Sequence, residues 1–155
     1  MESIDFSVIV CTRNRPEALF VTLGSIAKQT QTPYEVIVVD GSGDDSSERQ
    51  CRNASFKWGL IIKYIRAERS LTEQRNAGIR QNRGEVVVFL DDDVILDKHY
   101  FQKMAAYFSR CQSRGEGTRC TTHPKGKSKT MAMKTLQNFP KLKNRGKKAV
   151  AVWDL

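Results

Sequence analysis

The chain has 155 residues and a formal net charge of +9, and this length suits one domain with a single hydrophobic core. The charge is distributed unevenly. Residues 1–108 contain 14 Lys and Arg against 15 Asp and Glu, a net charge of −1, whereas residues 109–155 contain 12 against 2, a net charge of +10. The basic isoelectric point therefore excludes no class of partner for the first two thirds of the chain.

The four cysteines are scattered without a Cys-x-x-Cys pair, and the N-terminus lacks the charged and then apolar pattern of a signal peptide. We therefore expect a reduced, cytoplasmic chain. The longest apolar run is shorter than the roughly 18 to 20 residues that cross a bilayer, so no transmembrane helix is expected. A peripheral position at the inner face of a membrane stays open.

Four runs in the first 90 residues predict strands. Their apolar residues are continuous rather than alternating, which is typical of strands buried on both faces. Several are rich in β-branched residues, and the second ends in a turn-forming Gly-Ser-Gly-Asp sequence. The four runs are Phe6–Thr12, Tyr34–Asp45, Gly59–Ala67 and Glu85–Leu90.

Helices are predicted between the first and second of these strands and between the third and fourth. Residues 15–30 place Leu19, Leu23 and Ile26 at helical spacing, with Pro16 suited to the first turn. Residues 70–84 predict a shorter helix with a thin apolar face. Strands that alternate with helices indicate an α/β fold with a mostly parallel, Rossmann-like sheet.

Polar and acidic residues follow three of these strands. Residues 12–15, 40–45 and 91–93 each come at the carboxyl end of a strand, and ligands of parallel sheets bind in the crevice outside these ends. Adjacent carboxylates repel unless a cation stabilises them, and oxygen ligands suit Mg²⁺ or Mn²⁺. In an extended backbone, Asp91 and Asp93 would lie on one face and Asp92 on the other.

A solvated turn is the alternative interpretation of Asp91–Asp93, because Asp is a common turn residue. Asp40 and its glycine-rich loop stand at the matching end of another strand. Together, the two acidic strand ends favour a ligand site over a plain turn.

Three motifs, "FSVIVCTRNRP", "EVIVVDGSGD" and "EQRNAGIRQNRGEVVVFLDDDV", resemble in order and spacing those of the family 2 glycosyltransferases. These are inverting nucleotide-sugar transferases with the GT-A fold. The resemblance covers about residues 5–108. It implies a hexosyltransferase-like enzyme with a nucleotide-sugar donor, a UDP-sugar or a similar one, and an acceptor that the sequence does not identify.

The resemblance also implies roles for individual residues. Thr12 and Asp40 would hold the nucleobase, with Asp40 accepting a hydrogen bond from a base N–H group. Ser42 and Asp44 would lie in the same nucleotide loop, and Arg75 would line the nucleotide pocket.

Within the Asp-x-Asp signature, the resemblance assigns Asp91 and Asp93 to Mn²⁺ or Mg²⁺ and Asp92 to the nucleotide. The exact division of contacts between Asp91 and Asp92 stays open. The metal would act as a Lewis acid that stabilises charge on the departing nucleoside diphosphate. An acceptor hydroxyl would attack the anomeric carbon with the help of a general base, and the sequence identifies no such base.

The resemblance fails from about Ser109, so we expect a truncated nucleotide-sugar domain at residues 1–108 and a basic, disordered or non-native tail at 109–155. Residues 129–139 ("KTMAMKTLQNF") are predicted to form at most one helix. The tail is either a cationic arm or the product of a change of reading frame. A cationic arm would make weak contact with anionic membranes, and no specific nucleic-acid recognition is expected.

A change of frame would leave the sheet incomplete and make catalysis improbable. Metal-dependent sugar transfer is therefore the first functional hypothesis. The alternatives are a non-catalytic nucleotide-binding remnant and a basic-tailed binding module.

Overall fold

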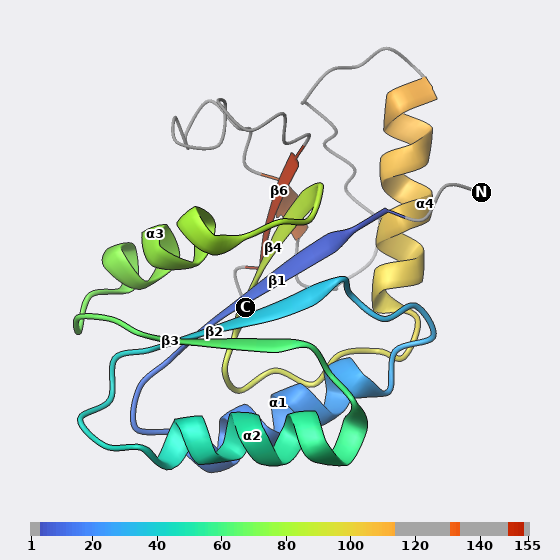
Figure 1. Ribbon diagram of the computed structural model, residues 1–155. Helices are drawn as coiled ribbons and strands as arrows, with labels where there is room; N and C mark the ends of the chain where they lie inside the picture. Colours follow the sequence, from blue (N-terminus) through green and yellow to red (C-terminus); the bar gives the residue numbers. More distant parts are fainter. Residues whose placement is uncertain (1–3, 114–130, 134–148, 154–155) are drawn as a thin grey trace.

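The computed structural model describes residues 4–113, 131–133 and 149–153, which form a twisted sheet with helices on both faces (Figure 1). The strands are β1 (Phe6–Thr12), β2 (Glu35–Asp40), β3 (Ile62–Arg66), β4 (Val86–Asp91), β5 (Met131–Met133) and β6 (Ala149–Trp153). The helices are α1 (Pro16–Ala27), α2 (Ser46–Trp58), α3 (Leu71–Gln81) and α4 (Tyr100–Ser113). Within this part of the chain, no helix is long and apolar enough to cross a membrane.

The sheet has the strand order β3-β2-β1-β4-β6-β5. Neighbouring strands from β3 to β6 pair in parallel, and β5 pairs antiparallel with β6. This confirms the predicted α/β fold with a mostly parallel sheet. The chain changes direction across the sheet between β1 and β4, and such a switch point opens a crevice at the carboxyl ends of the strands.

Two hydrophobic clusters cover the two faces of the sheet. One joins β1, β2 and β4 to α1, α2 and α4 through residues such as Phe6, Leu23 and Phe101, all with 0% exposure. The other joins the opposite face of the same strands to α3, with Ile9, Ala77 and Phe89 among its members. Figure 1 shows α3 on one side of the sheet and α1 and α2 on the other.

Burial separates the edge strand from the central ones. β1, β2 and β4 are buried along nearly their whole length, as their continuous apolar runs predict, whereas β3 is half-buried and its last residue is exposed. β3 pairs with β2 at the end of the strand order. Its position explains why β3 has Lys63 in its interior, whereas the charged residues of β2 and β4 stand only at strand ends.

Gly78 allows α3 to pack closely on β1. A Cβ atom at Gly78 would lie 2.6 Å from Ile9 Cγ2, which is far inside van der Waals contact. The helix therefore lies directly on the sheet at this point. One turn earlier, α3 reaches the carboxyl end of β1, where the Gln74 amide bonds to the Thr12 carbonyl and the charge of Arg75 acts on Cys11.

The helix α2 was not predicted from the sequence. Its buried residues are Ser47, Cys51 and Ala54, which are too small and too few to give a recognisable apolar stripe. It packs against the sheet through these small residues, and Gly59 ends it in the left-handed conformation with φ of 68°.

After Phe108, the structure continues α4 to Ser113 and adds two strands to the sheet, β5 and β6. Met131–Met133 is therefore a strand and not part of a helix. β6 has the sequence Ala-Val-Ala-Val-Trp, a short apolar run of the kind that predicts a buried strand. The rest of the predicted tail, at 114–130, 134–148 and 154–155, lies outside the described residues.

Candidate functional site

The sheet register brings three predicted site residues to one edge. Thr12 of β1 is the register partner of Asp40 of β2. On the other side of β1, Cys11 is the register partner of Asp91 of β4. Thr12, Asp40 and Asp91 are the last residues of their strands, so their side chains gather around the crevice at the carboxyl ends.

The three consecutive aspartates differ in environment. Asp91 is half-buried at the end of β4, Asp92 is 7% exposed and the Asp93 side chain is 54% exposed. β4 ends at Asp91, and the chain turns at Asp92 and Asp93. The expected alternation, with Asp91 and Asp93 on one face, applies to extended backbone and therefore does not describe this loop.

Asp92 is fixed from two sides. Its Oδ2 accepts a hydrogen bond from the Thr12 hydroxyl at 2.7 Å. Its backbone carbonyl accepts one from the Thr22 hydroxyl of α1 at 2.8 Å, and the same hydroxyl lies 2.9 Å from the Val94 carbonyl. The acidic loop is thereby tied to β1 and to α1, and its backbone position does not depend on a ligand.

Arg15 supplies a cation to the acidic loop. Its Nη1 lies 3.1 Å from Asp93 Oδ2 and 3.5 Å from Asp92 Oδ1. Arg15 precedes the first residue of α1 and follows Asn14, whose φ is 54°, a left-handed conformation that Asn tolerates better than most residues. The Arg15 side chain is 58% exposed, so these ion pairs are of the weak surface kind.

Asp40 lies in a hydrogen-bond network with 0% exposure. Its Oδ1 accepts hydrogen bonds from the backbone N–H of Ser42 at 2.8 Å and from the Ser42 hydroxyl at 2.5 Å. Its Oδ2 accepts one from the Tyr64 hydroxyl at 2.8 Å. Burial is the main cause that raises the pKa of Tyr64 to about 12, so the phenol remains a donor at neutral pH.

Ser42 also connects the two loops that follow β1 and β2. The backbone N–H of Asn14 donates to the Ser42 hydroxyl oxygen at 2.7 Å, while that hydroxyl donates to Asp40. Three hydrogen bonds, two from Ser42 and one from Tyr64, thus orient the Asp40 carboxylate. The N–H of Asn14 in turn fixes the Ser42 hydroxyl that makes one of them.

Asp44 lies further out in the same loop and is exposed. Its Oδ1 accepts hydrogen bonds from the N–H and hydroxyl of Ser46, the first residue of α2. These bonds are the main causes that hold the pKa of Asp44 below its usual value. The Arg66 guanidinium donates to the Asp44 carbonyl at 2.8 Å and to Asp45 Oδ1 at 2.7 Å.

Arg75 reaches the site from the opposite face of the sheet. Its guanidinium carbon lies 5.7 Å from the centre of the Phe89 ring, within the range of a cation–π interaction. Burial raises the pKa of Cys11 to about 12, and the charge of Arg75 opposes this rise. Arg75 therefore places positive charge beside Cys11, near the carboxyl end of β1, and its role in a nucleotide pocket stays a prediction.

Three residues of this arrangement were not predicted as site residues: Arg15, Tyr64 and Gln74. The Gln74 amide donates to the Thr12 carbonyl at 2.9 Å and to the Val39 carbonyl at 3.0 Å, so it holds the ends of β1 and β2 together. Arg15 and Gln74 both fall within the motifs "CTRNRP" and "EQRNAG". Their places in these motifs are the signal that could have identified them, and nothing comparable marks Tyr64.

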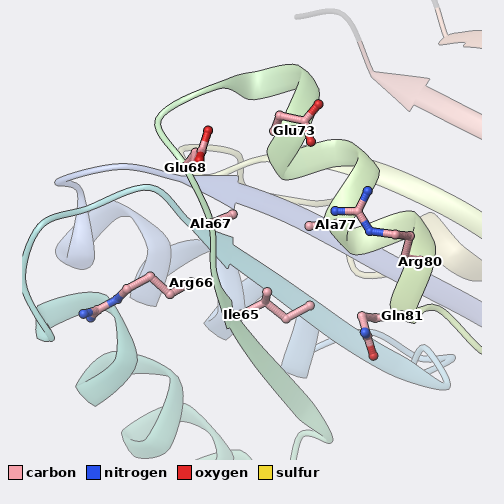
Figure 2. Close-up of a pocket in the computed structure, with 8 residues that line it drawn as sticks. All are labelled: Ile65, Arg66, Ala67, Glu68, Glu73, Ala77, Arg80 and Gln81. Carbon is pink, nitrogen blue, oxygen red and sulfur yellow. The ribbon is translucent and has the colours of Figure 1, made fainter.

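Two pockets flank this site. One has a volume of about 420 Å³ and lies between β3 and α3. Figure 2 shows its lining, which includes the apolar Ile65, Ala67 and Ala77 and the charged Glu68 and Arg80. The second, of about 720 Å³, lies against the β2–α2 loop and α2 and is lined by acidic residues and arginines. It includes Asp44 and Arg66, so it adjoins the loop that holds Asp40.

The donor set at the acidic loop suits a hard divalent cation. Asp91, Asp92 and Asp93 offer only oxygen ligands, and the single positive charge of Arg15 is shared between the carboxylates of Asp92 and Asp93. In the part of the chain that the structure describes, no group of three acidic, His or Cys side chains is arranged to hold an ion. Mg²⁺ and Mn²⁺ fit such a site, because Mg²⁺-type sites use one or two carboxylates together with substrate phosphates.

Comparison with known proteins agrees with this arrangement. A glycosyltransferase of Haemophilus influenzae, described as uncharacterized, is 34% identical over 87 residues, which are 56% of this chain and 29% of the relative. The crystal structure of Staphylococcus aureus TarS 1–349 with UDP-GlcNAc is 31% identical with a TM-score of 0.59, over 70% of this chain and 32% of that one.

A third protein is the mannosyltransferase PcManGT of Pyrobaculum calidifontis, solved with GDP-Man and Mn²⁺. It is 26% identical with a TM-score of 0.57, over 63% of this chain and 30% of that one. The chain thus spans about a third of the length of each of these proteins. These structures confirm the GT-A fold.

The profile of glycosyl transferase family 2 matches residues 7–151. The match begins in β1, contains every strand end described above and continues into β6. This chain therefore belongs to glycosyl transferase family 2.

Proposed function

We propose that this chain binds a nucleoside diphosphate sugar at the carboxyl ends of β1, β2 and β4, and that it takes part in metal-dependent, inverting transfer of the sugar. The observation that carries the proposal is the Thr12–Asp92 hydrogen bond of 2.7 Å. It holds a loop of three carboxylates beside the strand ends where ligands of parallel sheets bind.

In this proposal Asp40 recognises the nucleobase through a base N–H group. Its Oδ1 already accepts two hydrogen bonds from Ser42, whereas its Oδ2 accepts one from Tyr64. A carboxylate oxygen accepts up to two hydrogen bonds, so Oδ2 is the atom with capacity for the base. Because Asp40 has no exposed surface, the base reaches it when the half-buried Tyr64 side chain turns aside.

Asp91 and Asp93 would hold Mg²⁺ or Mn²⁺ in this proposal, with Asp92 and Arg75 on the nucleotide. The bound ion would supply Lewis-acid stabilisation to the departing diphosphate. The complexes of TarS with UDP-GlcNAc and of PcManGT with GDP-Man and Mn²⁺ support a nucleotide-sugar donor and a divalent ion. A UDP-sugar is the first donor to test.

Calorimetric titration of the full chain with UDP, with and without Mn²⁺, tests the donor site. We expect saturable binding in the presence of Mn²⁺, weaker binding without it, and a loss of at least tenfold in affinity in Asp93→Ala. Glu85→Gln is the matched control, because Glu85 is exposed and precedes β4 at the opposite end of the strand. Absence of UDP binding by the folded chain would overturn the proposal.

Turnover separates an enzyme from a non-catalytic remnant. An active chain should release UDP from a UDP-sugar slowly in water and faster with an acceptor, whereas a remnant binds the donor without releasing UDP.

Weak contact of the basic segment after Ser109 with anionic membranes is a further part of the proposal. Co-sedimentation with vesicles that contain phosphatidylserine, with neutral vesicles as the control, would detect such contact.

A further inference from the structure

We propose that Arg15 is an exchangeable cation of the donor site: it pairs with Asp92 and Asp93 in the ligand-free chain, gives way to the divalent ion, and then binds the donor diphosphate. This inference rests on the proposed function. It adds a positioning residue for the diphosphate and predicts that Arg15 has opposite effects on the binding of metal and of nucleotide.

The contacts of Arg15 place it where the ion would bind. A single nitrogen, Nη1, contacts Asp92 Oδ1 at 3.5 Å and Asp93 Oδ2 at 3.1 Å. A divalent ion on Asp93 would stand close to this guanidinium, and the two positive charges would repel. Arg15 and the ion therefore compete for the Asp93 carboxylate.

The ion pairs of Arg15 are weak enough to exchange. The side chains of Arg15 and Asp93 are 58% and 54% exposed, and exposed ion pairs contribute little because water screens them. Asp92 stays in place without Arg15, since Thr12 and Thr22 bond to its side chain and its backbone. The exchange thus needs only the arginine side chain to move.

The backbone of Arg15 keeps the displaced side chain near the ligand. Arg15 precedes Pro16 at the start of α1, and its carbonyl accepts a hydrogen bond from the N–H of Leu19 at 3.0 Å. On the other side, the N–H of Asn14 donates to Ser42. A diphosphate bound to an ion on the acidic loop would lie beside this anchored arginine, whose other N–H groups suit phosphate oxygens.

Arg15→Gln and Arg13→Gln form a matched pair for the test. Both changes remove one positive charge from the same exposed loop, two residues apart. Arg15 is the member of the pair whose guanidinium contacts Asp92 and Asp93. Binding of Mn²⁺ alone is measured by electron paramagnetic resonance of the free ion, and binding of UDP at saturating Mn²⁺ by calorimetry. Circular dichroism confirms that each variant is folded.

We expect Arg15→Gln to bind Mn²⁺ about two- to fivefold more tightly than the unmodified chain, and UDP with Mn²⁺ about tenfold more weakly. Arg13→Gln should change both affinities less than about twofold. Arg15→Lys keeps the positive charge but loses the planar guanidinium, whose paired N–H groups match phosphate oxygens. Its Mn²⁺ affinity should therefore stay near that of the unmodified chain, while its UDP binding weakens.

Equal effects of Arg15→Gln and Arg13→Gln on both ligands would overturn the inference, and so would weaker Mn²⁺ binding by Arg15→Gln. If either of these results is found while UDP binding still needs Mn²⁺ and Asp93, the proposed donor site stands and only the role of Arg15 fails. If the unmodified chain binds neither Mn²⁺ nor UDP, both proposals are overturned.

Discussion

Thr12 and Asp92 are 80 positions apart in the sequence, and a 2.7 Å hydrogen bond joins the hydroxyl of one to the carboxylate of the other. Thr12 ends β1, and Asp92 follows β4. Parallel pairing of these two strands brings the residues together, so the geometry of the acidic loop depends on the assembled sheet.

Thr12→Val should therefore destabilise the chain. The substitution keeps the size of the side chain but leaves Asp92 Oδ2, in a residue that is 7% exposed, without its threonine donor. The expected loss is about 1 to 2 kcal/mol in the free energy of unfolding, measured by urea denaturation. Thr30→Val is the control, because the Thr30 hydrogen bonds are exposed and should cost about 0.5 kcal/mol or less. Equal losses in the two variants would contradict the importance of the Thr12 bond.

Tyr64→Phe should lower the free energy of unfolding by about 1 kcal/mol, because Asp40 Oδ2 loses its phenol donor in a site with 0% exposure. Ser42 continues to donate to Oδ1, so the loop should remain folded. Tyr34→Phe makes the same chemical change at a residue that is 45% exposed and should be close to neutral. A neutral Tyr64→Phe in thermal and urea unfolding would show that the phenol does not hold Asp40.

Gly78→Ala should destabilise the chain, although alanine normally favours helix. The new Cβ would lie 2.6 Å from Ile9 Cγ2, and overpacking of this kind costs about 1 to 3 kcal/mol, against roughly 1 kcal/mol gained in helix propensity. We expect a lower midpoint of thermal unfolding. Gly43→Ala is the control, since its nearest contact would be an ordinary 3.7 Å to Arg69 Nη2. A raised midpoint in Gly78→Ala would mean that α3 moves away from β1 at little cost.

Cys51 should react slowly with iodoacetamide in the folded chain. Burial raises the pKa of its thiol to about 12, so at pH 8.5 fewer than about one thiol in a thousand is ionised, whereas the unfolded thiol is about half ionised. The folded chain holds this proton more tightly, so the contribution of Cys51 to stability is complete below about pH 8.5 and decreases as the pH rises toward 12.

Peptide mass spectrometry after alkylation at pH 8.5, in buffer and in urea, tests the protection of Cys51. Rapid labelling of the Cys51 peptide in buffer would show that α2 opens from the sheet, because Cys51 is 3% exposed in the folded chain.

The sequence was sufficient to predict β1, β2 and β4, because a continuous apolar run is typical of a strand that is buried on both faces. It also predicted that Thr12, Asp40 and Asp91 share one edge, since parallel strands align their carboxyl ends. It did not reveal α2, whose buried residues Cys51 and Ala54 are small, and it placed no strand at Ala149–Trp153.

The tertiary structure alone decided how the carboxylates are oriented and paired. The chain leaves the strand after Asp91, so the two-residue alternation that assigned faces to the aspartates ended there. The partners of Asp92 and Asp40, which include Thr12, Arg15 and Tyr64, come from other strands and loops. Hydrogen bonds and ion pairs act over a few ångströms in space, and local sequence patterns carry no information about which distant residues folding brings within that range.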